Sequence, residues 1–112
     1  MKQDNSLLHG TLDALILKSI AGEPRHGYAI ARGLEHATRH TLTIEAGSLY
    51  PALYRLEANG FIRSDWGTSE LGRRVKRYQL TAKGRRRLAK DTEAWSRFAD
   101  AISSVLLGGD PA

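Results

Sequence analysis

Apolar residues recur at helical spacing in four segments of this chain, and apolar and polar residues alternate between the third and fourth segments. The first helix is expected to begin after Ser6, which can cap its start. Its apolar positions are Leu7, Leu8, Leu12, Leu15, Ile16 and Ile20. A second, short helix is expected from Gly27 to about Ala37, with Ile30 and Leu34 as its core pair. The chain is therefore predicted to be mainly α-helical.

The third segment, residues 47–62, predicts a short helix with one apolar and one polar face. Ser48 is placed to cap the start of this helix, and Asn59-Gly60 ends it. Pro51 then falls in the first turn, where a backbone amide has no partner within the helix, so the amide hydrogen that proline lacks is not missed. The apolar arc holds Leu49, Ala52, Leu53 and Leu56, and the polar arc holds Ser48, Pro51, Tyr54, Arg55 and Ala58. The pattern fits an ordinary amphipathic surface helix or a DNA-reading helix. Tyr50 lies at an angle between the two arcs, which fits DNA contact or packing beside the core.

The connector of residues 36–45 contains β-branched residues without a strong period, so at most a minimal strand is expected at residues 42–44. His36 and His40 stand four residues apart and would share one face of a helix. The sequence contains no cysteine, no third histidine near this pair and no HExxH pattern, so we expect surface histidines and no metal site.

Two strand-like runs, residues 61–66 and 74–80, flank a glycine-bracketed turn at residues 67–73 and predict an exposed β-hairpin. Three cations, Arg73, Arg74 and Lys76, stand at or beside the tip. A tip of this kind can reach a phosphate backbone or a minor groove.

A final helix is expected from Thr81 to about Leu107, basic in its first turns and apolar along one side from Trp95 onward. A chain of this size has few surfaces that could bury this stripe, so we expect it to pack against the same helix and the first helix of a second subunit. The expected interface comprises Leu7, Leu8, Trp95, Phe98, Ala99, Ile102, Val105 and Leu106. The alternative is that the stripe folds back onto the first helix of one monomer.

Charge is concentrated in one part of the chain. The net charge is +5 over 112 residues, but residues 61–90 contain ten Lys or Arg against Asp65 and Glu70, a segment charge of +8. A basic segment in a small domain is typical of a protein that binds a polyanion. Nucleic acid is favoured over a membrane because no basic amphipathic anchor is present.

Length and composition further narrow the class of protein. The length fits one domain, and the absence of cysteine excludes a disulfide framework. No signal peptide is visible, and the most apolar run, residues 12–20, is interrupted by Asp13 and Lys18, so a soluble cytoplasmic protein is expected. The chain lacks a cysteine nucleophile, a phosphate-binding glycine loop and a paired catalytic histidine, so neither an enzyme nor a cofactor is expected.

The order helix, helix, helix, basic hairpin is that of a winged helix-turn-helix, and several motifs are more specific. They are Pro24-Arg25-His26-Gly27-Tyr28, Gly47-Ser48-Leu49-Tyr50-Pro51-Ala52-Leu53, Arg55-Leu56-Glu57, Gly60-Phe61-Ile62, Trp66 with Gly72-Arg73-Arg74, and Tyr78-Gln79-Leu80-Thr81-Ala82-Lys83-Gly84. On these residues the chain resembles the short form of the PadR family of bacterial transcriptional regulators, over roughly residues 7–106. Leu71 departs from the pattern, since polar residues are commoner at the hairpin tip.

The resemblance implies a winged helix-turn-helix in residues 1–80, a dimerisation helix in residues 81–107 and a disordered tail in residues 108–112. It implies a homodimeric repressor that binds an inverted-repeat operator, with a small aromatic effector bound near Trp95 in some short members. The other interpretation, which is favoured over a ligand role, is that Trp95 belongs to the dimer core. The implied DNA-facing residues are Ser48, Tyr50, Pro51, Tyr54, Arg55, Arg73, Arg74 and Lys76. The alternative function is a winged-helix module for protein or RNA binding, which would suit an uncharged wing.

Overall fold

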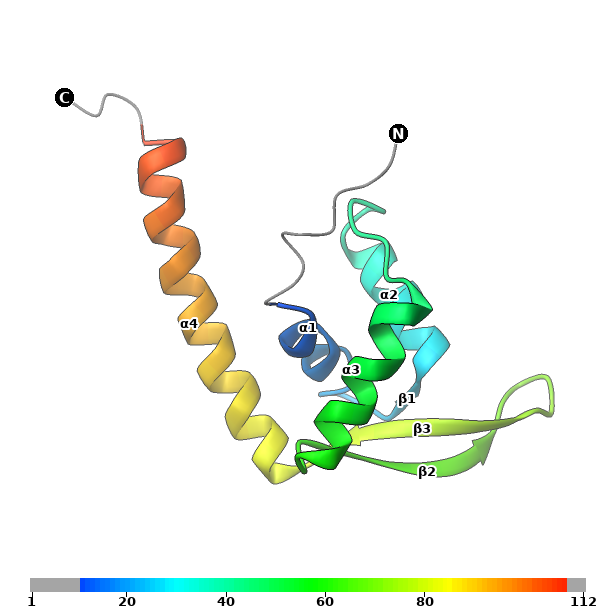
Figure 1. Cartoon of the computed structure of the whole chain (residues 1–112). Coiled ribbons are helices and arrows are strands. Elements are labelled where there is room, and N and C mark those ends of the chain that lie inside the picture. Colours follow the sequence, from blue (N-terminus) through cyan, green and yellow to red (C-terminus); the bar gives the residue numbers. More distant parts are fainter. Residues whose placement is uncertain (1–10, 109–112) are drawn as a thin grey trace.

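The computed structural model describes residues 11–108 as a helical body with a β-hairpin on one side and a long helix on the other (Figure 1). The elements in chain order are α1 (Leu12–Ser19), β1 (Arg25–His26), α2 (Gly27–Ala37), α3 (Ala46–Ala58), β2 (Ile62–Thr68), β3 (Arg74–Leu80) and α4 (Ala82–Leu106). The mainly α class with a small hairpin is thereby confirmed. Leu7, Leu8 and the expected cap Ser6 lie outside the described residues, as does the tail after Gly108.

One hydrophobic core joins α1, α2, α3 and the base of the sheet. Its fully buried members come from every one of these elements, so none of them is expected to hold its position alone. The core residues are Ile16, Leu17, Ile20, Ile30, Ala31, Leu34, Ile44, Leu49, Ala52, Leu53, Leu56, Ile62, Tyr78 and Leu80.

The apolar arc predicted for the third helix is the buried face of α3, but its start was predicted wrongly. α3 begins at Ala46 after an extended Glu45, whose carbonyl oxygen accepts bonds from the amides of Ser48 and Leu49. Ser48 is therefore inside the first turn and caps nothing. Pro51 lies in the second turn and cannot donate to the carbonyl of Gly47.

The predicted end of α3 is confirmed at Asn59, which caps the helix. Gly60 has a φ of 79°, in the left-handed region that favours glycine. Its amide donates to the Glu57 carbonyl and the Phe61 amide donates to the Leu56 carbonyl, which is the Schellman arrangement. The chain therefore turns sharply from α3 into β2.

The sheet is antiparallel with strand order β1-β3-β2. The third strand is β1 rather than the minimal strand expected at residues 42–44, which does not form. There the backbone bonds to side chains at the end of α2: the Ile44 amide donates to Glu35 Oε2 at 2.9 Å and the Leu42 amide donates to Oγ1 of Thr38, the residue that caps α2, at 3.3 Å. These bonds replace a partner strand and let Ile44 enter the core from an irregular segment.

α4 begins where it was predicted to begin. Thr81 Oγ1 accepts a hydrogen bond from the Gly84 amide at 3.0 Å and donates to the Gly60 carbonyl at 2.7 Å, so this cap also ties α4 to the end of α3. Leu88 packs against the core, but farther along the helix Phe98, Ile102 and Val105 are exposed. Within one chain, therefore, the part of the apolar stripe beyond Trp95 is not covered by α1, and α4 extends away from the body on the side opposite the hairpin (Figure 1).

Candidate nucleic-acid interface

The outer face of α3 is free of the protein body and is centred on Tyr54. Tyr54 is 79% exposed, and Gly47, Pro51 and Ala58 share its side of the helix and are also exposed. Ser48 lies exposed in the first turn. The helix thus has a fixed inner face and an accessible outer face, which is the geometry of a helix that can enter the major groove.

Tyr50 lies at the edge of α3 that faces α2, and it is 48% exposed. A Cβ added to Gly27 would stand 2.9 Å from the Tyr50 ring and hydroxyl, so the glycine at the start of α2 makes room for this side chain. Tyr50 therefore packs across the two helices and still presents part of its surface to solvent.

Beside Tyr50, α2 contributes two exposed residues that our sequence interpretation did not select. The Tyr28 ring is exposed and lies 5.9 Å from the guanidinium carbon of Arg32. Tyr28, Arg32 and Tyr50 together line a shallow hollow between α2 and α3. Tyr28 could have been selected from the sequence because it belongs to one of the motifs that carry the family resemblance. Nothing in the hydrophobic periodicity distinguishes Arg32.

Arg55 lies at the opposite edge of α3 and is held by another helix. Its Nη2 donates to Asp13 Oδ1 of α1 at 2.7 Å. Asp13 also lies 3.8 Å from Arg87 of α4, and Arg87 donates to Asp91 at 2.9 Å. Arg55 therefore stands at the junction of α1, α3 and α4, away from the centre of the outer face of α3.

Glu57, in the last turn of α3, joins the helix to the hairpin. Its carboxylate accepts a hydrogen bond from Ser64 Oγ of β2 at 2.6 Å and lies 3.9 Å from Lys76 Nζ of β3. The Lys76 side chain therefore extends from the hairpin toward the last turn of α3. These contacts fix the hairpin beside α3, and the first turns of α3 and the hairpin tip lie toward the same side of the molecule (Figure 1).

The loop that joins β2 to β3 is short, residues 69–73, and contains one acid, Glu70, and one of the three predicted cations, Arg73, while Arg74 and Lys76 lie in β3. The Arg73 amide donates to Ser69 Oγ at 3.1 Å, and Gly72 has a φ of 79°. Arg73 and Arg74 are exposed on the strand side of the tip, and Leu71 is exposed at the tip itself. The hairpin therefore presents cationic groups and one apolar side chain to any partner.

Buried Tyr78 lies beneath this surface. Burial raises the pKa of its hydroxyl above the ordinary value of 10.0, and the negative charge of Glu57 and the Tyr50 hydroxyl add to the rise. Tyr78 consequently remains neutral at physiological pH and contributes no charge to the interface.

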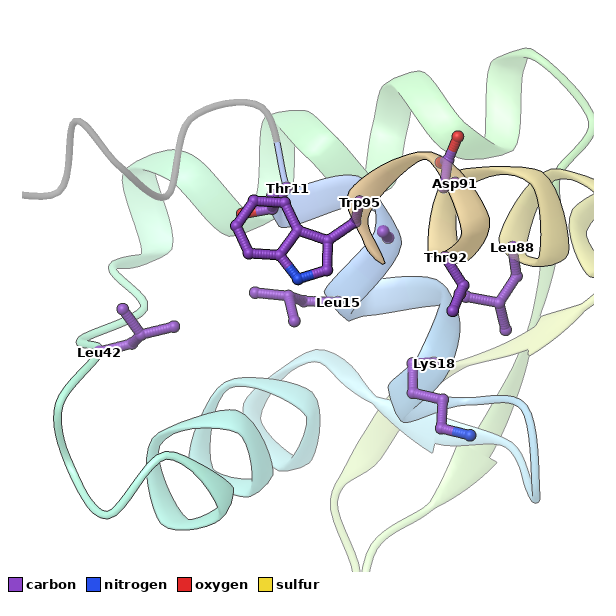
Figure 2. A pocket seen from close by; sticks show the side chains of 9 residues that line it. Thr11, Leu15, Lys18, Leu42, Leu88, Asp91, Thr92 and Trp95 are labelled. Carbon is purple, nitrogen blue, oxygen red and sulfur yellow. The ribbon is translucent and has the colours of Figure 1, made fainter. Parts of the chain in front are cut away.

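A cavity of about 480 Å³ lies between α1 and α4 (Figure 2). Trp95 projects over it toward Leu15 of α1, and Leu42 lies at its other side. The lining residues are Thr11, Ala14, Leu15, Lys18, Leu42, Leu88, Asp91, Thr92 and Trp95. Trp95, a residue expected at a dimer interface, thus faces this cavity, while Phe98, Ile102, Val105 and Leu106 are exposed beyond it and Ala99 is half-buried.

Residues 11–108 provide neither the side-chain cluster of a metal site nor the helix of a membrane span. No group of three or more His, Cys, Asp or Glu side chains there is placed to hold a metal ion, and the His36 and His40 rings meet edge to face at 6.5 Å. No helix in this part of the chain is both long enough and apolar enough to cross a bilayer.

The fold and the site together define a winged helix-turn-helix protein with a long carboxyl-terminal helix. The chain matches the model of the Transcriptional regulator PadR-like family over residues 16–90. A transcriptional regulator of Mycobacterium tuberculosis is 34% identical over 94 residues, which are 84% of this chain and 80% of that protein.

Solved structures give the same result. A transcriptional regulator from Clostridium thermocellum matches with a TM-score of 0.81 at 28% identity, over 89% of this chain and 97% of that one. A PadR-like transcriptional regulator from Bacillus cereus matches with a TM-score of 0.77 at 28% identity, over 89% and 95%. This chain therefore belongs to the PadR-like family of transcriptional regulators, and it is a regulator rather than an enzyme.

Proposed function

We propose that this chain is a homodimeric, DNA-binding repressor of the bacterial cytoplasm. Residues 1–80 form the DNA-binding unit and residues 81–107 the dimerisation helix. The observation that supports this most strongly is the exposed, Tyr54-centred face of α3 beside a hairpin that carries Arg73, Arg74 and Lys76. A major groove admits one helix, and the flanking phosphates attract the cations.

The residues of this surface have different roles in the proposal. Tyr54 is the side chain best placed to reach base edges. Ser48, Tyr50 and the hairpin cations contact phosphates and hold the register without reading sequence. Pro51 stands on the same outer face and shapes the helix surface that meets the groove.

Arg55 has a conditional role. A guanidinium can bind guanine through two parallel hydrogen bonds, but that of Arg55 is engaged by Asp13 at 2.7 Å. We infer that Arg55 reaches DNA only when a phosphate or a guanine replaces the Asp13 carboxylate.

The exposed side of α4 supports a homodimer. Trp95, Phe98, Ile102 and Val105 follow one another at spacings of three, four and three residues, which is the seam spacing of paired helices. An exposed apolar stripe of this length is rare on a monomer. Two subunits paired through α4 would present two α3 helices to an inverted repeat, with half-sites about one helical turn, or about 10 bp, apart.

The cavity beneath Trp95 supports an effector site. Its lining is mainly apolar, and an indole can stack on a flat aromatic molecule. We propose that such a molecule releases the repressor from DNA. The variant Trp66→Phe retains Trp95 as its single tryptophan, so a panel of flat aromatic compounds should change its emission. An unchanged emission across the panel would remove the effector from the proposal.

Binding of the chain to labelled duplexes from the region upstream of its own gene tests the main proposal. We expect at least one fragment to bind more tightly than an unrelated duplex of equal length, with affinity that falls as salt is added. Equal affinity for all duplexes, or binding that does not depend on salt, would contradict it.

A further inference from the structure

The β2–β3 hairpin has two different faces, which the strand register defines. Ser64 stands opposite Tyr78, Trp66 opposite Lys76, and Thr68 opposite Arg74. These pairs share the face whose base is buried with Ile62 in the core. Because Glu57 of α3 contacts both Ser64 and Lys76, this face of the hairpin is turned toward α3.

Trp66 lies where this face leaves the protein body. It is 57% exposed and belongs neither to the core nor to the apolar side chains packed against it. The guanidinium carbon of Arg74 lies 4.6 Å from the centre of the Trp66 ring, within the range of a cation–π contact. One part of the indole is thus covered by a cation, and the remainder is exposed on the hairpin face that is turned toward α3.

The charges around Trp66 indicate what kind of partner can bind the exposed part of the indole. Lys76 stands directly across the strand pair from Trp66, and Arg73 adjoins Arg74. A large aromatic surface framed by cations suits a partner that combines apolar carbon with phosphate, and the sugar–phosphate backbone of a duplex has that chemistry.

We propose that Trp66 packs against the deoxyribose of the DNA strand that passes between α3 and the hairpin, and that it orients Arg74 toward a phosphate of that strand. The inference rests on the proposed DNA-binding function and adds a residue that holds the backbone. Since sugar and phosphate carry no sequence information, this contact contributes equally to binding of operator and of unrelated duplex.

Acrylamide quenching of tryptophan emission tests the contact directly. Wild-type protein contains Trp66 and Trp95, and Trp66→Phe contains Trp95 alone. We expect a saturating duplex to protect the wild-type emission from acrylamide and to leave quenching of the variant unchanged. Anisotropy of the labelled duplex, followed in the same samples, reports whether DNA is bound.

Each outcome has a distinct meaning. No binding of any duplex overturns the proposed function and this inference with it. Binding without protection of the wild-type emission, or with equal protection in the Trp66→Phe variant, overturns the inference alone.

A mutant cycle tests whether Trp66 acts through Arg74. Arg74→Ala should reduce the magnitude of the slope of log K against log salt by about 0.9 for each bound subunit. Trp66→Leu should weaken operator and unrelated duplex by the same factor, and it should have less effect in the Arg74→Ala background. Arg63→Ala, which removes the same charge from the opposite face of β2, should change binding less than Arg74→Ala. Additive effects of Trp66→Leu and Arg74→Ala in folded proteins would exclude the positioning role.

Discussion

Arg55 Nη2 of α3 lies 2.7 Å from Asp13 Oδ1 of α1, and this ion pair connects the proposed DNA-reading helix to the first helix of the chain. Arg87 of α4 approaches the same carboxylate at 3.8 Å. One acidic side chain thus faces cations from two helices, so a change in the position of α4 would alter the charge that surrounds Arg55.

The ion pair leads to a prediction for Asp13→Asn. The Arg55 side chain is more than half exposed, so the pair contributes only about 0.2–1 kcal/mol to the free energy of unfolding, and the variant should remain folded. Because DNA no longer has to displace the carboxylate, affinity should rise by up to about fivefold. Urea unfolding and duplex titrations measure the two effects.

The background Arg55→Ala provides the control for this prediction. Asp13→Asn also removes a negative charge near the site, which would by itself favour DNA. If Asp13→Asn raised affinity by the same factor with Arg55 present and absent, the gain would not come from release of Arg55.

Tyr54 should control discrimination between DNA sequences rather than stability. Tyr54→Ala removes an exposed side chain, so the unfolding free energy should change by less than about 0.5 kcal/mol. The preference for operator over unrelated duplex should fall by at least about 1 kcal/mol, or roughly fivefold. Competition titrations with both duplexes measure this ratio. A uniform loss on both duplexes would instead identify Tyr54 as a backbone contact.

The exposed stripe of α4 should control assembly. Phe98→Asp would place an unpaired carboxylate in the proposed helix pair, at a cost of several kcal/mol, so the protein should become monomeric. Ser104→Asp adds the same charge on the opposite side of α4 and should leave the assembly unchanged. Sedimentation velocity distinguishes the two states, and a monomeric wild-type protein would exclude the homodimer.

Alkaline pH should destabilise the folded chain through Tyr78. The pKa of this buried hydroxyl is raised above 10.0, so the folded state retains its proton after the unfolded state has lost it. The resulting stabilisation of the unfolded state begins near pH 10 and grows until the pH passes the folded pKa. The unfolding free energy of the wild type should therefore fall relative to that of Tyr78→Phe as the pH is raised from 8 to 11.

Local periodicity predicted the helices and the hairpin because each of these elements has a buried face with a regular repeat. The spacing of Leu49, Leu53 and Leu56 located α3, and alternation located β3 with its observed bounds. The start of α3 was missed because the extended Glu45, which has no capping side-chain bond, precedes the helix three residues before the stronger cap former Ser48.

The structural features that the sequence did not predict depend on contacts between residues far apart in the chain, which no local pattern encodes. Asp13 and Arg55 are 42 positions apart, and β1 is a strand of two residues that exists only because β3 supplies its partners. The hairpin cations were predicted from their clustering, whereas the exposure of Trp66 and its contact with Arg74 required the register of β2 against β3.

A hydroxyl-radical footprint of this protein on the DNA upstream of its own gene shows whether it binds an operator as a symmetric dimer. Two α3 helices in successive major grooves should protect two symmetric half-sites about 10 bp apart. If the two subunits together neutralise about six phosphates, log K should fall with log salt at a slope near −5. Protection of a single unsymmetric site, or no protection at concentrations where the protein is dimeric, would contradict operator binding by a symmetric dimer.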